Sequence, residues 1–472
     1  MVISKIKRRT LFYACVGVFL VLSTFVMLYA FGYYINFRDQ TLTKTGGIFV
    51  KSSNASGIKI FLGGELVKET LFIMSGALLA NLAEGEYVVE IQKDGFLSWK
   101  KKINVQKEVV TEIRNIFLVP DRAGANNATS FGTTTSRYSL LSLSPDETAL
   151  LIRDQGDGLL LRANIPDIVQ KNGIKAITPE KNILSAAWNK DSTRILMKEL
   201  GGRFSILDPA ERAPNNTTPL PESLDDEEKN KPARVIAVEF DPAFSGVLLL
   251  DDSGVLSRFN YAQKGTTSVQ TLLENVNSFA VSNDTVLLLF QNGFFGRLRK
   301  NEDRVEVLGR KGVYFSGNNA RMHGSPEGGV YLIDESGGLF VMENDDLEIQ
   351  PQDGSVLGAE FDAKSRKLLY WKEGEFFIVY LKDEQYQPYR EKGTRVVIPF
   401  SGGKIKNAAW YGADGEHIVF LTDDGVYITD IDGRGGYDIK KIIDGTIRNF
   451  FISAKNKRLY WDDGRMVYET SL

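Results

Sequence analysis

Reactive side chains are scarce in this sequence. Its 472 residues include a single cysteine, Cys15, and two histidines, His323 and His417. One thiol excludes a disulfide framework and a cysteine-based zinc site within one chain. The sequence also lacks a Gly-x-Ser-x-Gly nucleophile elbow, a Gly-x-x-x-x-Gly-Lys-Ser/Thr phosphate loop and a His-Glu-x-x-His zinc motif. We therefore expect no catalytic residue, no cofactor and no metal site, and a protein that is not an enzyme.

Hydrophobic residues, in contrast, are plentiful. They make up 43% of the chain, and aromatic residues make up 11%. This composition suffices for well-packed cores and excludes a chain that is disordered throughout. The formal net charge is only −3, and we expect no nucleic-acid partner.

The N-terminus has the pattern of a membrane anchor. Four basic residues lie between Lys5 and Arg9, and no charged residue occurs from Thr10 to Phe37. Residues 11–34 are long and apolar enough to cross the lipid bilayer as a helix. A cleavable signal peptide is the alternative, but the apolar run is too long for one. The basic tail, residues 1–10, then stays in the cytoplasm, and the bulk of the chain lies outside the cytoplasmic membrane.

Residues 46–120 read as a small all-β unit. Gly85-Glu86-Tyr87 and Gly95-Phe96-Leu97-Ser98-Trp99 lie in or beside alternating segments, and Gly63-Gly64 marks a hairpin turn. This stretch resembles a PEGA domain, a β-sandwich module found mostly in exported or surface proteins. Ala83 departs from that pattern, because the family usually has proline there. The resemblance implies a non-catalytic role as a spacer or second contact, and residues 121–130 then form a linker.

A hairpin pattern recurs from residue 131 to the C-terminus. Its clearest copy, Asn407 to Asp430, has an alternating strand, a turn, an apolar strand, an acidic glycine turn and a third strand. Seven further copies begin at Leu141, Ser185, Val238, Phe279, Arg321, Ala359 and Phe450. The turn glycines recur roughly every forty-four residues, which is the period expected for four-stranded propeller blades.

These copies resemble the bacterial propellers with WD40-like or TolB-like repeats. Ser144-Pro145-Asp146 and Ala413-Asp414-Gly415 match the Ser-Pro-Asp-Gly turn of those repeats. The resemblance implies a β-propeller over residues 131–472. Eight hairpins predict eight blades, or seven if the copy around Arg321 is irregular. The last copy leaves no room for a fourth strand, so we expect residues 131–136 to supply it and close the ring.

Residues 209–233 interrupt the repeat. They hold five prolines and an acidic run, with few apolar residues. We expect an exposed loop between blades, either a tolerated insertion or a segment that docks a partner.

Acidic turns are the one chemical feature that recurs. If they all join second and third strands, propeller geometry places them on one face. The candidate partner-binding acidic rim is Asp251, Asp252, Asp334, Glu335, Asp423, Asp424, Asp462 and Asp463. Such a rim would suit divalent cations or a basic partner. The alternative, which we favour, is that Asp-Gly is good turn chemistry and acidic loops keep an exported protein soluble.

The sequence therefore predicts an all-β protein with one N-terminal transmembrane helix, a PEGA-like β-sandwich and a C-terminal propeller. We expect a binding or scaffolding protein of the bacterial cell envelope, held in the bilayer by residues 11–34. Its partner would be an unknown envelope protein, which the propeller contacts. The alternative is a carbohydrate-directed propeller, either a polysaccharide binder or an enzyme of the glycosidase or lyase type.

Overall fold

The structure is a computed structural model that describes most of the chain. The described residues are 5–30, 33–36, 41–121, 129–131, 137–165, 174–178, 182–210, 217–224, 233–242, 246–260, 268–282, 284–300, 304–308, 312–317, 320–343 and 349–472. They form two compact units. The first comprises residues 1–121 with the segments 384–389 and 432–438, and the second comprises the remaining residues from 122 onward.

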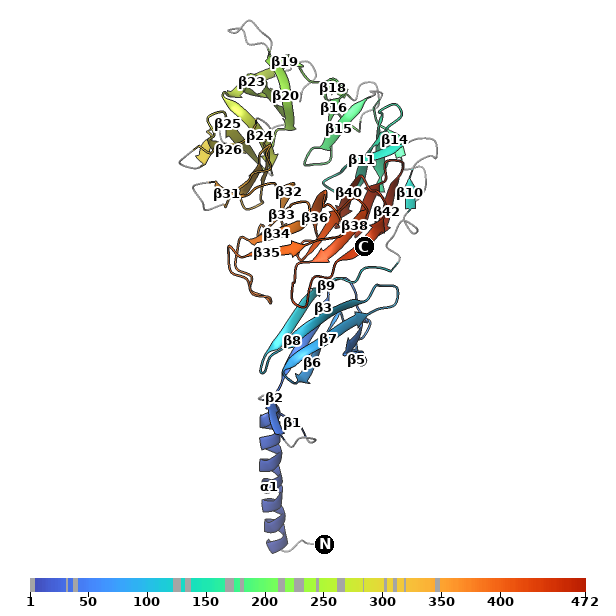
Figure 1. Ribbon diagram of the computed structural model, residues 1–472, viewed down its shortest axis with the longest axis vertical. Helices are drawn as coiled ribbons and strands as arrows, with labels where there is room; N and C mark the ends of the chain where they lie inside the picture. Colours follow the sequence, from blue (N-terminus) through green and yellow to red (C-terminus); the bar gives the residue numbers. More distant parts are fainter. Residues whose placement is uncertain are drawn as a thin grey trace. The chain divides into compact units, whose positions relative to one another are not determined.

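The first unit begins with the chain's long apolar helix, α1 (Lys5–Ala30), drawn in dark blue in Figure 1. Its segment Arg8–Met27 has a mean hydropathy of 2.2 over 20 residues. At 1.5 Å per residue this segment is about 30 Å long, which matches the hydrocarbon core of a bilayer. The helix is therefore long and apolar enough to span a membrane.

The predicted span of residues 11–34 is too long at its C-terminal end. The helix ends at Ala30, and Tyr33 and Tyr34 lie in strand β1 (Tyr33–Asn36). Strand β1 pairs antiparallel with β2 (Thr41–Lys44). The physical reason is local preference, because Gly32 is a poor helix former and the Tyr-Tyr-Ile run after it favours strands.

Two packed sheets form the rest of this unit. One has the strand order β5-β4-β7-β8 and the other β6-β3-β9. The strands are β3 (Gly46–Ser52), β4 (Lys59–Leu62), β5 (Glu65–Glu69), β6 (Gly76–Leu82), β7 (Gly85–Gln92), β8 (Trp99–Val105) and β9 (Val110–Ile116). The alternating burial of β8 shows how the core forms, since Trp99, Ile103 and Val105 point inward from every second position. Gly63 and Gly64, both at positive φ, form the predicted β4–β5 turn.

The second unit is a β-propeller of eight sheets in the described residues. Blades 1 to 4 consist of β11 (Tyr138–Leu143), β12 (Ala149–Asp154), β13 (Leu160–Asn164) and β14 (Ile174–Ala176); β15 (Ile183–Trp188), β16 (Ile195–Glu199), β17 (Phe204–Leu207) and β18 (Thr217–Pro219); β19 (Ser223–Leu224), β20 (Ala233–Phe240), β21 (Gly246–Asp251), β22 (Leu256–Asn260) and β23 (Ser268–Leu273); β24 (Val276–Ser282), β25 (Thr285–Phe290), β26 (Phe295–Arg299) and β27 (Glu306–Leu308). Each blade is one antiparallel meander, as the repeated hairpins predicted.

Blades 5 to 8 complete the ring. They consist of β28 (Arg321–Gly324), β29 (Val330–Ile333), β30 (Leu339–Met342) and β31 (Gln350–Asp353); β32 (Gly358–Phe361), β33 (Lys367–Trp371), β34 (Glu375–Tyr380) and β35 (Arg395–Pro399); β36 (Asn407–Tyr411), β37 (His417–Leu421), β38 (Gly425–Asp430) and β39 (Lys440–Asp444); β40 (Asn449–Ser453), β41 (Arg458–Asp462), β42 (Val467–Ser471) and β10 (Thr129–Phe131). We number the strands within a blade from the ring axis outward. The first strands of neighbouring blades contact each other, which places them innermost.

The ring closes between the ends of the unit, as predicted, but with an earlier segment. Strand β10 pairs antiparallel with β42, with Ser130 opposite Tyr468. These strands lie side by side in Figure 1, teal beside dark red. The prediction had placed this strand at residues 131–136, and residues 132–136 lie outside the described part. Thr129 and Ser130, assigned to the linker, belong to the propeller instead.

The predicted loop at residues 209–233 also contains strands. Thr217–Pro219 is the fourth strand of blade 2, and Ser223–Leu224 pairs with β20 of blade 3. Between them Leu220 is only 5% exposed. The proline-rich composition concealed these strands, because proline is tolerated where a strand lies at a sheet edge. Residues 211–216 and 225–232 of this stretch lie outside the described part.

The first turn, between the first and second strands, follows a common design in blades 1, 2 and 6. In blade 2 the Asn189 side-chain oxygen accepts hydrogen bonds from the backbone N–H of Thr193 and Arg194, at 2.8 and 2.9 Å. Ser144 and Asp362 do the same in blades 1 and 6. The fourth residue of this turn has a positive φ and is Glu147 in blade 1, Ser192 in blade 2 and Ser365 in blade 6, whereas blade 5 has Gly328 there. In blade 8 the non-glycine residue with a positive φ is Lys457, one position later.

Replacing Lys457 by glycine is expected to stabilise the propeller. Lys457 is exposed and has a φ of 51°, a left-handed conformation that costs a non-glycine residue about 1 kcal/mol. Glu147→Gly is the contrasting variant. It relieves the same strain but removes a carboxylate that accepts hydrogen bonds from the Ser453 hydroxyl and the Lys455 N–H of blade 8. Thermal unfolding should show a higher midpoint for K457G and a lower one for E147G.

Candidate functional site

The predicted acidic rim lies in the turns between second and third strands of blades 3, 5, 7 and 8. Its three buried members build those turns. Asp251 accepts hydrogen bonds from the N–H groups of Ser253 and Val255, both at 2.9 Å. Asp334 accepts from Ser316, Ser336 and Gly338. Asp462 accepts from Gly464 within its turn and from Leu140 of blade 1, and burial raises its pKa to about 6.

The more accessible members of the rim have partners as well. Asp423 pairs with Lys406 at 2.7 Å. The Lys441 ammonium, 2.8 Å away, holds the pKa of Asp424 down at about 2. Asp252 accepts a hydrogen bond from the Arg234 N–H, and Asp463 accepts two from its own turn.

Glu335 completes the rim and is exposed. In the described part of the chain no group of three or more His, Cys, Asp or Glu side chains is arranged to hold a metal ion. Asp251, Asp334, Asp462 and Asp463 accept hydrogen bonds within their own turns. Asp423 and Asp424 form ion pairs, and Asp252 accepts from a neighbouring strand. A partner-binding role for this rim stays a prediction.

Two half-buried glutamates occupy equivalent positions on innermost strands, Glu239 on β20 and Glu360 on β32. Each joins its blade to the next one. The Val281 N–H donates to Glu239 at 2.6 Å, and the Trp410 N–H donates to Glu360 at 3.1 Å. Burial raises the pKa of both carboxyls to about 7, because the charged form loses its hydration.

A groove runs between blades 5 and 6, and we call it the blade 5–6 groove. It encloses about 470 Å³, within the size range of small-ligand and side-chain pockets. Its floor is apolar and consists of Val341, Met342, Phe361 and Leu381. The Ser365 hydroxyl in its wall is buried and has no hydrogen-bond partner among the described residues. A buried hydroxyl without a partner costs free energy, which a bound group offering a hydrogen bond would recover.

Two ion pairs cross the rim of the groove. Lys392 of blade 6 pairs with Glu343 of blade 5 at 2.5 Å, and Lys382 of blade 6 pairs with Glu327 of blade 5. Their side chains are between 28% and 54% exposed. Ion pairs with this exposure contribute about 0–1 kcal/mol each, so an incoming segment can exchange them at little cost. The lining of the groove thus combines apolar side chains, one buried hydroxyl without a partner among the described residues and charges of both signs.

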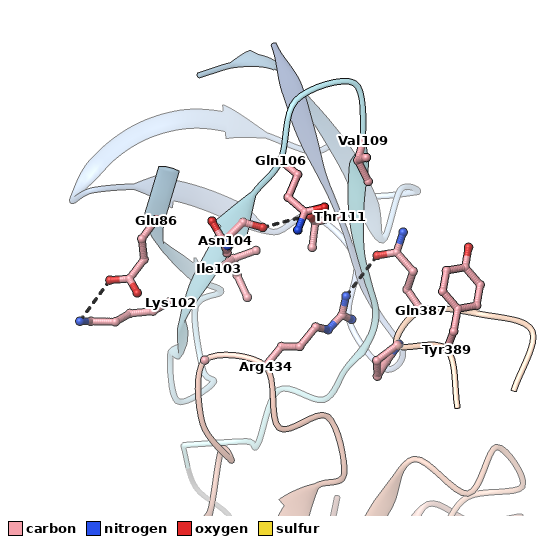
Figure 2. Close-up of a pocket in the computed structure, with 12 residues that line it drawn as sticks. Glu86, Lys102, Ile103, Asn104, Gln106, Val109, Thr111, Gln387, Tyr389 and Arg434 are labelled. Carbon is pink, nitrogen blue, oxygen red and sulfur yellow. Dashed lines mark hydrogen bonds and ion pairs between the residues drawn. The ribbon is translucent and has the colours of Figure 1, made fainter. Parts of the chain in front are cut away.

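The first unit has a larger cavity, of about 650 Å³, shown in Figure 2. Gln387 covers the edge of strand β9, since its side-chain oxygen accepts from the Glu112 N–H and its amide donates to the Val110 carbonyl. Arg434 donates to Gln387, to the Glu112 carbonyl and to both oxygens of Asp432. Most donors of the Arg434 guanidinium are therefore used in hydrogen bonds that hold segments 384–389 and 432–438 against β9. We therefore assign Gln387 and Arg434 a structural role.

Sequence reasoning missed both the groove and the glutamates. The glutamates left a signal, because Val238-Glu239-Phe240-Asp241 and Ala359-Glu360-Phe361-Asp362 repeat the same pattern. No sequence pattern indicates the groove, since its lining comes from separate strands and turns of two blades. Of the two histidines, His417 is buried on β37, and His323 lies on β28.

The sequence and the structure were also compared with known proteins. No protein-family model and no curated protein matches the sequence. Among solved structures, the C-terminal WD40 domain of Sif2 aligns with a TM-score of 0.48 at 12% identity, covering 73% of this chain and 98% of that one. Hsv2 from Kluyveromyces lactis aligns at 0.41 and 10%, covering 64% and 98%. Dihydro-heme d1 dehydrogenase NirN aligns at 0.45 and 14%, covering 67% of each chain. At such identities and TM-scores the likeness carries no inference about function.

Proposed function

We propose that this protein is a membrane-anchored binding protein of the bacterial cell envelope whose propeller contacts a protein partner through the blade 5–6 groove. The observation that carries the proposal is the groove itself, with its apolar floor and the unpartnered Ser365 hydroxyl. A protein segment suits it, because an apolar side chain would fill the floor while a backbone amide meets the hydroxyl.

Helix α1 supports the anchoring part of the proposal. It is long and apolar enough to span a membrane. The basic residues Lys5, Lys7, Arg8 and Arg9 all lie at its N-terminal end. By the positive-inside rule this end stays in the cytoplasm, which places both β units outside. The bilayer is then the protein's first partner, and the groove serves a second one.

Site-specific photo-crosslinking tests the proposal. A benzophenone side chain placed at Leu381, in the groove, should crosslink to one protein species when the full chain is irradiated in its native membranes. The same group at Val307, an exposed position on blade 4, is the matched control. Crosslinking to polysaccharide, or equal patterns from both positions, would contradict a protein-binding groove.

A charge in the floor should abolish the contact. Leu381→Glu is expected to weaken partner binding by at least about tenfold, because a buried carboxylate replaces an apolar contact. Val307→Glu should leave binding unchanged, since this side chain is 56% exposed and lies outside the groove. The measurement is the crosslinking yield from a second groove position, Met342, in each variant.

The carbohydrate-directed alternative would use paired carboxylates near the ring axis. Among the described residues, the half-buried Glu239 and Glu360 lie on innermost strands, but they belong to blades 3 and 6. Each already accepts a hydrogen bond from the neighbouring blade. This arrangement supports a structural role for them and favours the protein-binding proposal.

A further inference from the structure

The first unit exposes four consecutive apolar side chains on one loop. Leu71, Phe72, Ile73 and Met74 connect β5 to β6 and are 62%, 82%, 70% and 51% exposed. We call them the apolar loop. Leu66, Val67 and Leu78 beside it are also exposed. Contiguous apolar surface of this kind is unfavourable in water and marks a site of contact with a protein or a membrane.

Hydrogen bonds hold the apolar loop in shape. The Thr70 hydroxyl accepts from the Ile58 N–H at 2.8 Å and donates to the Met74 carbonyl at 3.0 Å. The Met74 N–H donates back to the Leu71 carbonyl, and the Gly57 N–H donates to Met74. The side chains are thus presented outward by a pre-organised backbone, which lowers the entropic cost of inserting them elsewhere.

We infer that the apolar loop inserts into the interface of the same bilayer that holds α1. No charged residue occurs from Thr70 to Ala83, so insertion desolvates no ion. Lys68 at the base of the loop can extend its ammonium toward the lipid headgroups while its stem stays with the apolar side chains. This inference rests on the proposed anchoring and adds a second, reversible membrane contact to it.

The length of the tether allows this contact. Pairing of Tyr33 with Lys44 folds the linker back on itself, so Gly46 lies within about 25 Å of Ala30 at the end of α1. Strand β3 is about 20 Å long, and the loop lies at its far end, where Lys51 pairs with Gly76. The apolar loop can therefore reach the bilayer surface when strand β3 lies parallel to that surface.

A second copy of the chain fits this surface less well. The free edge of β5 would have to pair with itself antiparallel, centred on Val67. That register places Glu65 opposite Glu69 of the other copy, and like charges directly opposite each other are destabilising. A lipid interface requires no such pairing.

Spin labelling of the full chain in phosphatidylcholine vesicles tests the inference. The single native cysteine, Cys15, reports on the helix. With Cys15→Ser as background, Phe72→Cys and Ile73→Cys report on the loop, and Tyr314→Cys, fully exposed on the propeller, is the reference. Collision rates of the nitroxide with oxygen, which partitions into lipid, and with a water-soluble nickel chelate give its depth. We expect the oxygen-to-nickel ratio at positions 72 and 73 to exceed that at position 314 several-fold.

The outcomes separate the two proposals. If the label at Cys15 is accessible to nickel, the anchoring fails and the loop inference fails with it. If Cys15 is in lipid but positions 72 and 73 match position 314, only the loop inference is overturned. Labels at 72 and 73 that are shielded from both agents and broadened by a neighbouring label would show self-association, which also overturns it.

Discussion

Replacing Glu239 or Glu360 by glutamine is expected to stabilise the propeller at pH 8 and to leave it unchanged near pH 4. The pKa of each carboxyl is about 7 in the folded protein, against the ordinary glutamate value of 4.5. A folded-state pKa above the unfolded one means that the folded protein binds more protons between these values. The stability that each protonated carboxyl contributes is therefore fully present below pH 4.5, and this contribution is lost as the pH rises through 7.

The size of this effect follows from the two pKa values. Each unit of difference is worth about 1.4 kcal/mol, so each glutamate costs the folded state about 3 kcal/mol at pH 8. Glutamine keeps the acceptor for the Val281 or Trp410 N–H but carries no charge to desolvate. The measurement is the midpoint of thermal unfolding from pH 4 to 8, followed by the fluorescence of the buried tryptophans. Glu222→Gln, at an exposed position, is the matched control.

A profile for E239Q and E360Q that parallels the wild type at every pH would contradict the raised pKa values. A loss of stability at pH 4, where Glu239 and Glu360 are protonated in the folded protein, would show that glutamine does not fit the site. The two variants should behave alike, because Glu239 and Glu360 occupy the same position in their blades.

Breaking the buried ion pair between blades 6 and 7 should destabilise the propeller strongly. The Lys367 ammonium lies 2.6 Å from Glu416 and donates to the Gly415 carbonyl at 3.0 Å. The Lys367 side chain is 3% exposed. Lys367→Ala removes one partner of a buried pair, which typically costs about 3–5 kcal/mol. A marked fall in the thermal midpoint is expected.

An exposed ion pair in the same part of the ring is the control for this variant. Lys404 pairs with Glu373 at 3.0 Å, and both side chains are more than 60% exposed. Lys404→Ala should cost less than about 1 kcal/mol. Equal effects of the two substitutions would show that burial of Lys367 does not matter.

The double variant Lys367→Met with Glu416→Leu should recover much of the loss, because well-packed apolar side chains can replace a buried pair.

Local patterns in the sequence predicted most of the architecture. The uncharged run after Arg9 predicted α1, and the acidic glycine turns predicted the second hairpin of every blade. The faint copies at Phe279 and Arg321 are real blades, β24–β27 and β28–β31. These elements depend on neighbouring residues, so their signals survive in the sequence alone.

The errors arose where a distant partner decides the structure. Thr129 to Phe131 becomes a strand because the free edge of β42 is available to it, and Thr217 to Pro219 does so beside β17. Three-residue strands carry too little local preference to be recognised. The end of α1 at Ala30 was missed because the apolar run continues past it into β1.

The sequence by itself determined the apolar helix, the small β unit and the repeated hairpins of the propeller, because each follows from residue preferences over a few turns or strands. Only the tertiary structure decided which side chains act together. Burial of Glu239 and Glu360, the apposition of Phe361 and Leu381 in the blade 5–6 groove, and the exposure of Phe72 on its loop all depend on contacts between residues far apart in the chain. Periodicity predicts which face of a strand is apolar, but only packing decides what covers that face.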